Sequence, residues 1–90
     1  MNLTLHGRCR VKIYKHKDKC NIAGKNIRNI RNAYKLSQEE LAAQLQVAGL
    51  NLNQKAISRI ETGDRVVADY ELKKLAELLR VPVDTLLDEA

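Results

Sequence analysis

The chain has 90 residues, 44% of them hydrophobic, which suffices for one small core but not for two. Phe and Trp are absent, so aliphatic side chains must form that core, and this composition favours a bundle of short helices over a sandwich or barrel. The net charge is +5, and the lack of any run of about 18 apolar residues or of a signal-peptide apolar region argues against a membrane span and against secretion.

The positive charge is concentrated towards the amino-terminal end. Residues 1–35 hold ten Lys and Arg against the single acid Asp18, whereas residues 36–90 hold six bases against ten acids. The two parts therefore carry +9 and −4. Such asymmetry indicates a polyanionic partner such as nucleic acid, although a solvated, partly disordered basic face would have the same composition.

Residues 1–23 differ from the rest of the chain and are expected to form a basic arm, followed by a domain over residues 24–90. In the arm, Cys9, Val11 and Ile13 alternate with basic residues, which predicts a short edge strand blunted by its charges. The arm could follow DNA phosphates or enter a minor groove, or it could supply a strand for dimer formation.

Four residues of the arm have metal-ligand chemistry. They are His6, Cys9, His16 and Cys20. Their six-residue middle spacing is short for a zinc finger or ribbon, so we expect no metal. Because we place the chain in the cytoplasm, we also favour free thiols over a disulfide.

A first helix is expected from Gly24, because the period changes there from two to 3.6 residues. Ile27, Ile30 and Tyr34 form its apolar stripe, with Arg31 beside them.

A second helix should follow Ser37. Ser37 and Glu40 have the spacing of a capping box, in which the hydroxyl and the carboxylate each accept a backbone N–H. The helix would bury Leu41, Ala42 and Leu45.

A third helix should run from about residue 53 to residue 62. Asn53 is a good N-cap residue, Gly63 is free to adopt a positive φ after the helix, and Ile57 and Ile60 would face inward.

The last two helices are marked less clearly. The fourth should span about residues 69–79, and because Ala68 precedes it, Asp69 must cap it or its start frays. A fifth should open at Pro82, which a first helical turn tolerates, and should bury Val83, Leu86 and Leu87.

Three segments in order, LSQEELA, IS-x-IE-x-G and LA-x-LL-x-V-x-VD-x-LL, resemble the Cro/phage-repressor type of helix-turn-helix regulators over residues 24–87. The resemblance implies a compact all-α, five-helix, lambda-repressor-like DNA-binding domain. In such a domain the second and third helices form the motif, and the third enters the major groove.

The turn within this motif is longer than the family pattern. Several additional residues lie between Leu45 and Ile57, and they are not a random polar loop. We expect residues 47–52 to be an ordered elaboration whose leucines, Leu50 and Leu52, pack against the core, because exposing them would forfeit roughly 1.5–3 kcal/mol each. Its tip would then reach the DNA backbone or a partner. The alternative is a flexible loop.

The outer face of the third helix carries side chains that can read base edges in the major groove. Long amide and cationic groups near a helix N-terminus suit this purpose, so Gln54 and Lys55 are expected to read bases first. The full set of candidate base readers is Gln54, Lys55, Ser58 and Arg59.

Phosphate contacts are expected near helix N-termini, where free amides and the helix dipole favour anions. Gln38 matches the position at which the resembling family commonly grips the backbone. The remaining candidates are Asn53, Arg65, Lys25 and Arg28, and for the last two a purely solvated role is an equal alternative.

The resemblance also implies an ion pair between the first and third helices. Domains of this type often join an Arg to a Glu at the positions of Arg31 and Glu61. We expect a partly buried pair that holds the third helix in place.

No set of nucleophile, base or paired acids can be assembled, and AGKN lacks the spacing of a phosphate-binding loop, so an enzyme is not expected. The favoured function is a sequence-specific transcriptional regulator, a repressor, that binds double-stranded DNA as a two-fold homodimer. The dimer contact would use the fifth helix, an edge of the fourth, or the arm, and no small-molecule effector site is expected. An antitoxin that represses its own operon and a protein-binding helical adaptor are the alternatives.

Overall fold

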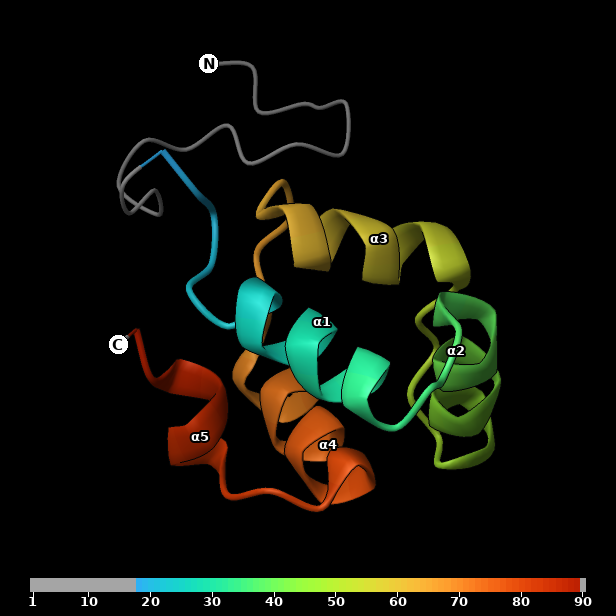
Figure 1. Ribbon diagram of the computed structural model, residues 1–90. Coiled ribbons are helices and arrows are strands. Elements are labelled where there is room, and N and C mark those ends of the chain that lie inside the picture. The colour runs from blue at the N-terminus through green and yellow to red at the C-terminus, as the bar shows by residue number, and fades with distance from the viewer. Residues whose placement is uncertain (1–17, 90) are drawn as a thin grey trace.

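The computed structural model describes residues 18–89, which form an all-α domain of five helices (Figure 1). The expected strand in the arm and three of the four possible zinc ligands lie outside the described residues. In chain order the helices are α1 (Gly24–Ala33), α2 (Gln38–Val47), α3 (Gln54–Thr62), α4 (Asp69–Leu79) and α5 (Val83–Leu87). None of the helices within residues 18–89 is long and apolar enough to cross a membrane.

The caps of α2 and α3 form as the sequence predicts. Ser37 Oγ accepts the Glu40 backbone N–H at 2.9 Å, and Glu40 Oε1 accepts the Ser37 N–H at 2.8 Å. Asn53 Oδ1 accepts the Ala56 N–H at 2.8 Å and so begins α3. Gly63 ends α3 with a φ of 84°, in the left-handed region that glycine tolerates best.

The start of α4 differs from the prediction. Asp69 does not cap the helix, and the start is nevertheless held, because Glu71 Oε1 accepts the Ala68 backbone N–H at 3.0 Å. This is half of a capping box, since alanine has no side-chain oxygen for the other half. At the opposite end Arg80 takes the left-handed position, with a φ of 60°, that many helices give to glycine.

The prediction for α5 needs two corrections. Pro82 is the N-cap residue that precedes α5 and not its first residue, because its ψ of 152° is extended. Leu87 is 39% exposed, so of the three predicted apolar residues only Leu86 is fully buried, while Val83 packs against the core from its edge.

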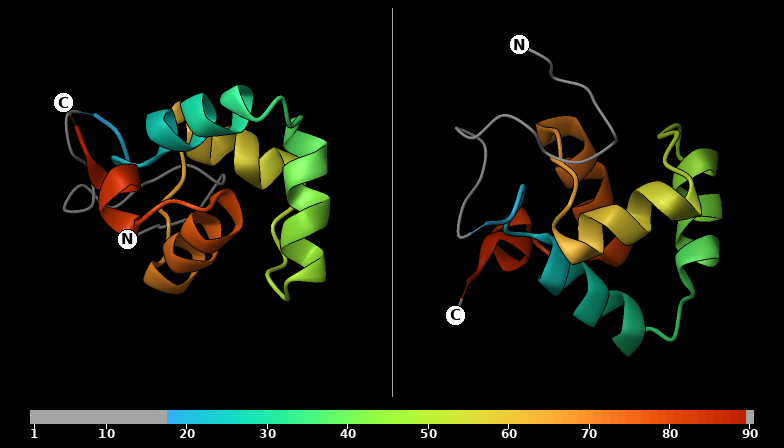
Figure 2. Two further views of the ribbon diagram at one scale, coloured as in Figure 1. Left: turned by 60° about the horizontal axis from the view of Figure 1, so that its bottom comes forward. Right: turned by 90° about the horizontal axis from the view of Figure 1, so that it is seen from above.

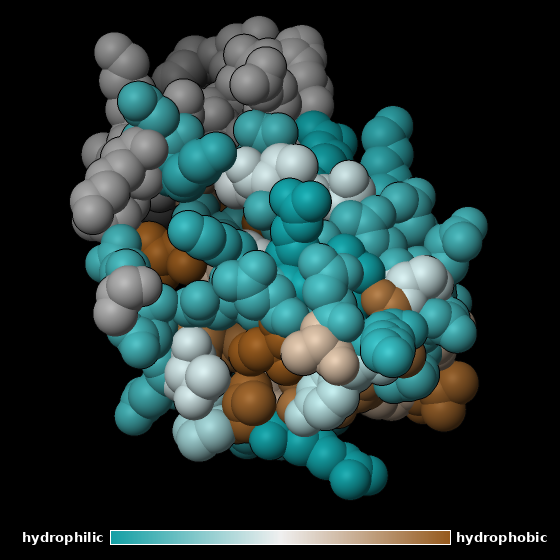
Figure 3. Space-filling model, in the orientation of Figure 1, coloured by the Kyte–Doolittle hydropathy of each residue, from teal (hydrophilic) through white to brown (hydrophobic). Residues whose placement is uncertain are grey.

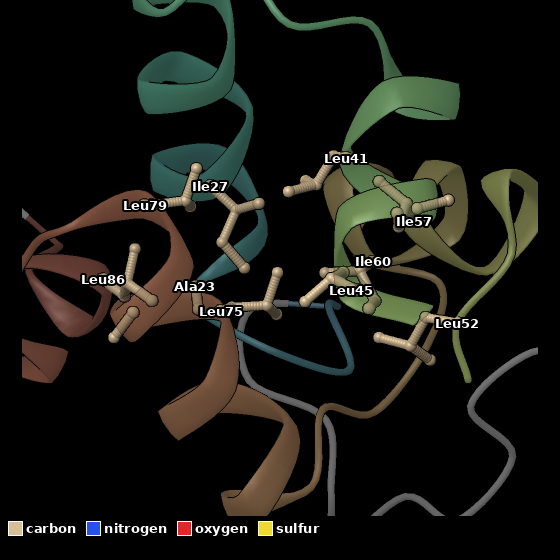
Figure 4. Packing of buried hydrophobic residues seen from close by; sticks show 12 residues of the cluster. Ala23, Ile27, Leu41, Leu45, Leu52, Ile57, Ile60, Leu75, Leu79 and Leu86 are labelled. Carbon is tan, nitrogen blue, oxygen red and sulfur yellow. The ribbon is translucent and has the colours of Figure 1, made fainter. Parts of the chain in front are cut away.

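The core is a single aliphatic cluster to which every helix contributes (Figure 4). α1 contacts α3, α4 and α5, and it lies between α3 and α4 in the view of Figure 1. α5 packs beside α1 and α4, as Figures 1 and 2 show. The fully buried side chains are those of Ile27, Leu41, Leu45, Ile57, Ile60, Leu75, Leu79 and Leu86.

The long turn between α2 and α3 places its leucines as expected. α2 ends in a turn in which the Leu50 N–H donates to the Leu45 carbonyl at 2.8 Å and Gly49 has a φ of 94°. Leu52 is 2% exposed and belongs to the core, and Leu50 packs against it. Val47, by contrast, is 90% exposed.

The described end of the predicted arm docks on the domain. The Cys20 N–H donates to the Gly63 carbonyl at 2.8 Å, and Asn21 Nδ2 donates to the Ile60 and Arg65 carbonyls at 3.1 and 2.7 Å. Ala23 is buried in the core. Residues 19–23 are therefore joined to the carboxyl-terminal end of α3.

Candidate nucleic-acid interface

α2 and α3 cross at a steep angle, with α3 running over the top of the domain in Figure 1 and α2 at one side of it. Small side chains permit this crossing. Ala42 on α2 is 5% exposed, and Ala56 on α3 packs against the core cluster. The crossing leaves the opposite face of α3 open to solvent.

The four predicted base readers share that open face. Gln54 and Lys55, at the amino-terminal end of α3, are exposed, while Ser58 and Arg59, one turn further on, are half-buried. In the space-filling view hydrophilic residues predominate in the upper part of the visible face, where α3 lies (Figure 3). The amino-terminal end of α3 thus offers an amide and an ammonium group to any surface that approaches it.

Arg31 and Glu61 form a buried ion pair between α1 and α3. Arg31 Nε lies 2.7 Å from Glu61 Oε2, and Nη2 donates to Oε1 at 3.1 Å, in the forked geometry that a guanidinium and a carboxylate favour. The two side chains are 10% and 2% exposed. Arg31 Nη1 also donates to the Leu36 carbonyl at 2.6 Å, so the same group holds the turn before α2.

A chain of amide hydrogen bonds connects this buried pair to the exposed end of α3. Gln38 Nε2 donates to Glu61 Oε1 at 2.9 Å, and Gln54 Nε2 donates to Gln38 Oε1 at 2.6 Å. Because a carboxylate can only accept, Gln38 must turn its NH2 group towards Glu61 and its carbonyl oxygen towards Gln54. The ion pair therefore sets the orientation of both amides.

The predicted phosphate contacts fall into separate places. Gln38, at the first position of α2, and Asn53, at the N-cap of α3, lie with the base readers. Lys25 and Arg28 lie on α1 beside the opposite end of α3, near Thr62.

Arg65 is engaged in a contact that the sequence did not predict. Its Nη1 and Nη2 donate to the two carboxylate oxygens of Glu71 at 2.9 and 3.1 Å, and Nη1 also donates to the Val66 carbonyl at 3.0 Å. Burial by itself would raise the pKa of Glu71. The hydrogen bonds from Arg65 and from the Ala68 N–H, with the Arg65 charge, outweigh it, so the pKa of Glu71 lies below its ordinary value.

A family model described as helix-turn-helix (HTH_3) matches residues 27–86. The chain belongs to this helix-turn-helix family. The resemblance to Cro/phage-repressor regulators is thereby confirmed, as is the five-helix fold, and the family is not one of enzymes. Comparison with curated protein sequences gives no significant match.

The helix-turn-helix fold is also similar to a solved structure, the crystal structure of the DNA-binding domain of BldD. The two share 27% sequence identity with a TM-score of 0.68, over 82% of this chain and all of the BldD domain.

Besides the pair of Arg65 with Glu71, two further contacts of this site were not predicted from the sequence. The bond between Gln38 and Gln54 joins residues 16 positions apart, and Asn21 reaches residues 39 and 44 positions away. None of these three side chains lies in a local sequence pattern that would identify its partner. The spacing of Glu71 three residues after the N-cap of α4 is a usable signal, but the absence of Ser or Thr at residue 68 conceals it.

Proposed function

We propose that this chain is a sequence-specific DNA-binding transcriptional regulator that acts as a repressor, with α3 as the helix that reads the major groove. The observation that carries the proposal is the amide chain, because it holds an exposed Gln54 in one orientation from a buried ion pair. A side chain held in this way does not lose rotamer freedom when it meets a base, which favours binding. The similarity to the DNA-binding domain of BldD supports the same function.

The orientation of Gln54 suits adenine. One N–H of Gln54 is given to Gln38, which leaves the second N–H and the carbonyl oxygen for a base edge. Adenine offers the N7 acceptor and the N6 donor side by side in the major groove, and this pair matches an amide. Lys55 is proposed to reach a guanine O6 or N7, and Ser58 and Arg59 to read or support the neighbouring positions.

Phosphate contacts at this end of the domain are assigned to Gln38 and Asn53. Both stand at helix N-termini, where backbone N–H groups and the helix dipole favour an anion. The cap bond uses only the carbonyl oxygen of Asn53, so its NH2 group remains a donor. Arg65 is proposed to add charge on the far side of α3 while it keeps its pair with Glu71.

One such domain reads few base pairs, so we propose that the protein acts as a two-fold homodimer. Its half-sites would then lie about one helical turn apart, roughly 34–36 Å between centres. The binding site would be close to palindromic.

Selection from a random duplex library tests the proposal directly. We expect a palindromic site, and Gln54→Ala should lower the preference for one base pair in each half-site by roughly 1–3 kcal/mol, or about 5- to 150-fold. Gln44→Ala is the matched control, because it removes an exposed side-chain amide from α2 and not from α3. It should leave the base preference unchanged. Recovery of no preferred sequence, with salt-dependent binding alone, would overturn sequence reading and favour a non-specific DNA-binding or adaptor function.

A further inference from the structure

A basic groove lies at the carboxyl-terminal end of α3, opposite the end proposed to read bases. It has a volume of about 440 Å³ and is bounded by residues 19–22, the first turns of α1 and the last turn of α3. Three cationic side chains line it: those of Lys19, Lys25 and Arg28.

The positive charge of the groove is not neutralised by its own walls. The only acid among the lining residues is Glu61, whose carboxylate already accepts from Arg31 and Gln38. Lys19 uses one of its three N–H donors on the Thr62 carbonyl, at 3.1 Å. Within residues 18–89 the side chains of Lys25 and Arg28 make no ion pair, so their charges are available to an anion.

The dimensions of α3 place this groove at the edge of a bound duplex. The nine residues of α3 extend for about 13 Å at 1.5 Å per residue. The major groove is about 12 Å wide and 8.5 Å deep. A helix whose amino-terminal end reaches the floor of that groove therefore has its other end near the rim, where the phosphates lie.

We propose that the groove formed by Lys19, Lys25 and Arg28 receives a phosphate of the DNA backbone at the rim of the major groove. The proposal rests on the proposed function, since it takes α3 as the reading helix. It assigns Lys19, which the sequence did not single out, to the interface. It also separates Lys25 and Arg28 from the phosphate contacts at the start of α2 and α3.

Such a contact adds affinity without sequence preference. Each phosphate neutralised by a cation releases counterions, so the logarithm of the binding constant falls against the logarithm of salt concentration with a slope of about −0.9 per contact. The groove should therefore contribute to specific and non-specific binding by the same factor. Its loss should leave the preferred sequence unchanged.

The test uses the full chain and a fluorescent duplex of random sequence, with anisotropy measured from about 50 to about 200 mM salt. The double variant Lys25→Gln with Arg28→Gln keeps two good helix formers in α1. Because one phosphate contact is lost, we expect its salt slope to be shallower by about 0.9 for each bound domain and its affinity at the lower salt concentrations to fall by roughly tenfold. A further Lys19→Gln change should extend both effects.

The control removes two lysines from α4, which lies at the opposite side of the domain from α3 in the view of Figure 1. Lys73→Gln with Lys74→Gln makes the same change in net charge. An equal loss in the two double variants would show a general charge effect and overturn the proposal, while leaving the Gln54 test of base reading unaffected. A second experiment titrates the protein with inorganic phosphate at constant ionic strength and follows the NMR signals of the Gly24 and Gly63 amides. Saturation at low millimolar phosphate would indicate a site for small anions and would also overturn the proposal.

Discussion

The two ends of α3 are held in different ways. At the amino-terminal end, the polar contact with α2 is between the side-chain amides of Gln38 and Gln54, and the chain enters through a turn anchored by Leu52. At the carboxyl-terminal end, the contacts are bonds to backbone carbonyls from residues 19–21, together with the close approach of Gly24. A Cβ added at Gly24 would lie 2.0 Å from the Ile60 carbonyl oxygen, so only glycine fits there.

This difference separates the end of α3 that can exchange partners from the end that cannot. An exposed amide can give up a hydrogen bond to a neighbour and take one from a base at little net cost. The Asn21 side chain, by contrast, donates to two part-buried backbone carbonyls, those of Ile60 and Arg65, and breaking both bonds at once costs more. The amino-terminal end is therefore suited to reading bases, and the carboxyl-terminal end is suited to fixing the angle of α3 on the rest of the domain.

The largest effect is expected at the residue that serves both ends, Glu61. Glu61→Ala leaves the Arg31 guanidinium without its carboxylate in the interior, so the free energy of unfolding should fall by about 3–5 kcal/mol. It also removes the acceptor that orients Gln38, so base preference should weaken in parallel. Urea denaturation measures the first effect, and binding to the selected duplex measures the second.

Glu77→Ala is the matched control for this change. Glu77 forms a pair with Lys74 at 3.4 Å, but both side chains are largely solvated, at 54% and 38% exposure. Its loss should cost less than about 0.5 kcal/mol. If Glu61→Ala is as mild as this control, the ion pair does not hold α3.

A smaller loss is expected from the turn that precedes α3. Leu52→Ala opens a cavity under the start of the helix and should lower the free energy of unfolding by about 2–4 kcal/mol. Val47→Ala, at the last residue of α2 and 90% exposed, should change it by less than about 0.5 kcal/mol. Equal, small effects in the two variants would show that the elongated turn is a loop that does not contribute to the stability of the fold.

Much of the amino-terminal end could be predicted from the sequence, because its determinants are local. The capping box at Ser37, the N-cap at Asn53 and the apolar periodicity each lie within a few residues of the structure that they specify. The packing of Leu50 and Leu52 followed from the cost of exposing two leucines. These features depend on spacing and hydrophobicity, which a single sequence displays.

The carboxyl-terminal end could not be predicted in the same way. Residues 19–23 were assigned to the arm because the helical period begins only at Gly24, whereas the Asn21 side chain joins them to α3 from 39 residues away. Arg65 was expected on DNA, and its pair with Glu71 depends on how the chain turns between α3 and α4. Contacts between polar residues that lie far apart in the sequence produce no periodic pattern from which they could be predicted.

The smallest effect is expected at this less predictable end and depends on pH. The pKa of Glu71 is lowered in the folded chain, so its carboxylate contributes stability above the unfolded pKa, near the ordinary value of 4.5, and that contribution is lost as the pH falls through the folded pKa. Glu71→Gln keeps an acceptor for the Ala68 N–H but gives up the charge that faces Arg65. At neutral pH we expect a loss of roughly 1 kcal/mol. Thermal melts of both proteins from neutral to strongly acidic pH should therefore converge on the acid side, and a difference that stays constant through that range would mean that the Glu71 charge does not fix the turn after α3.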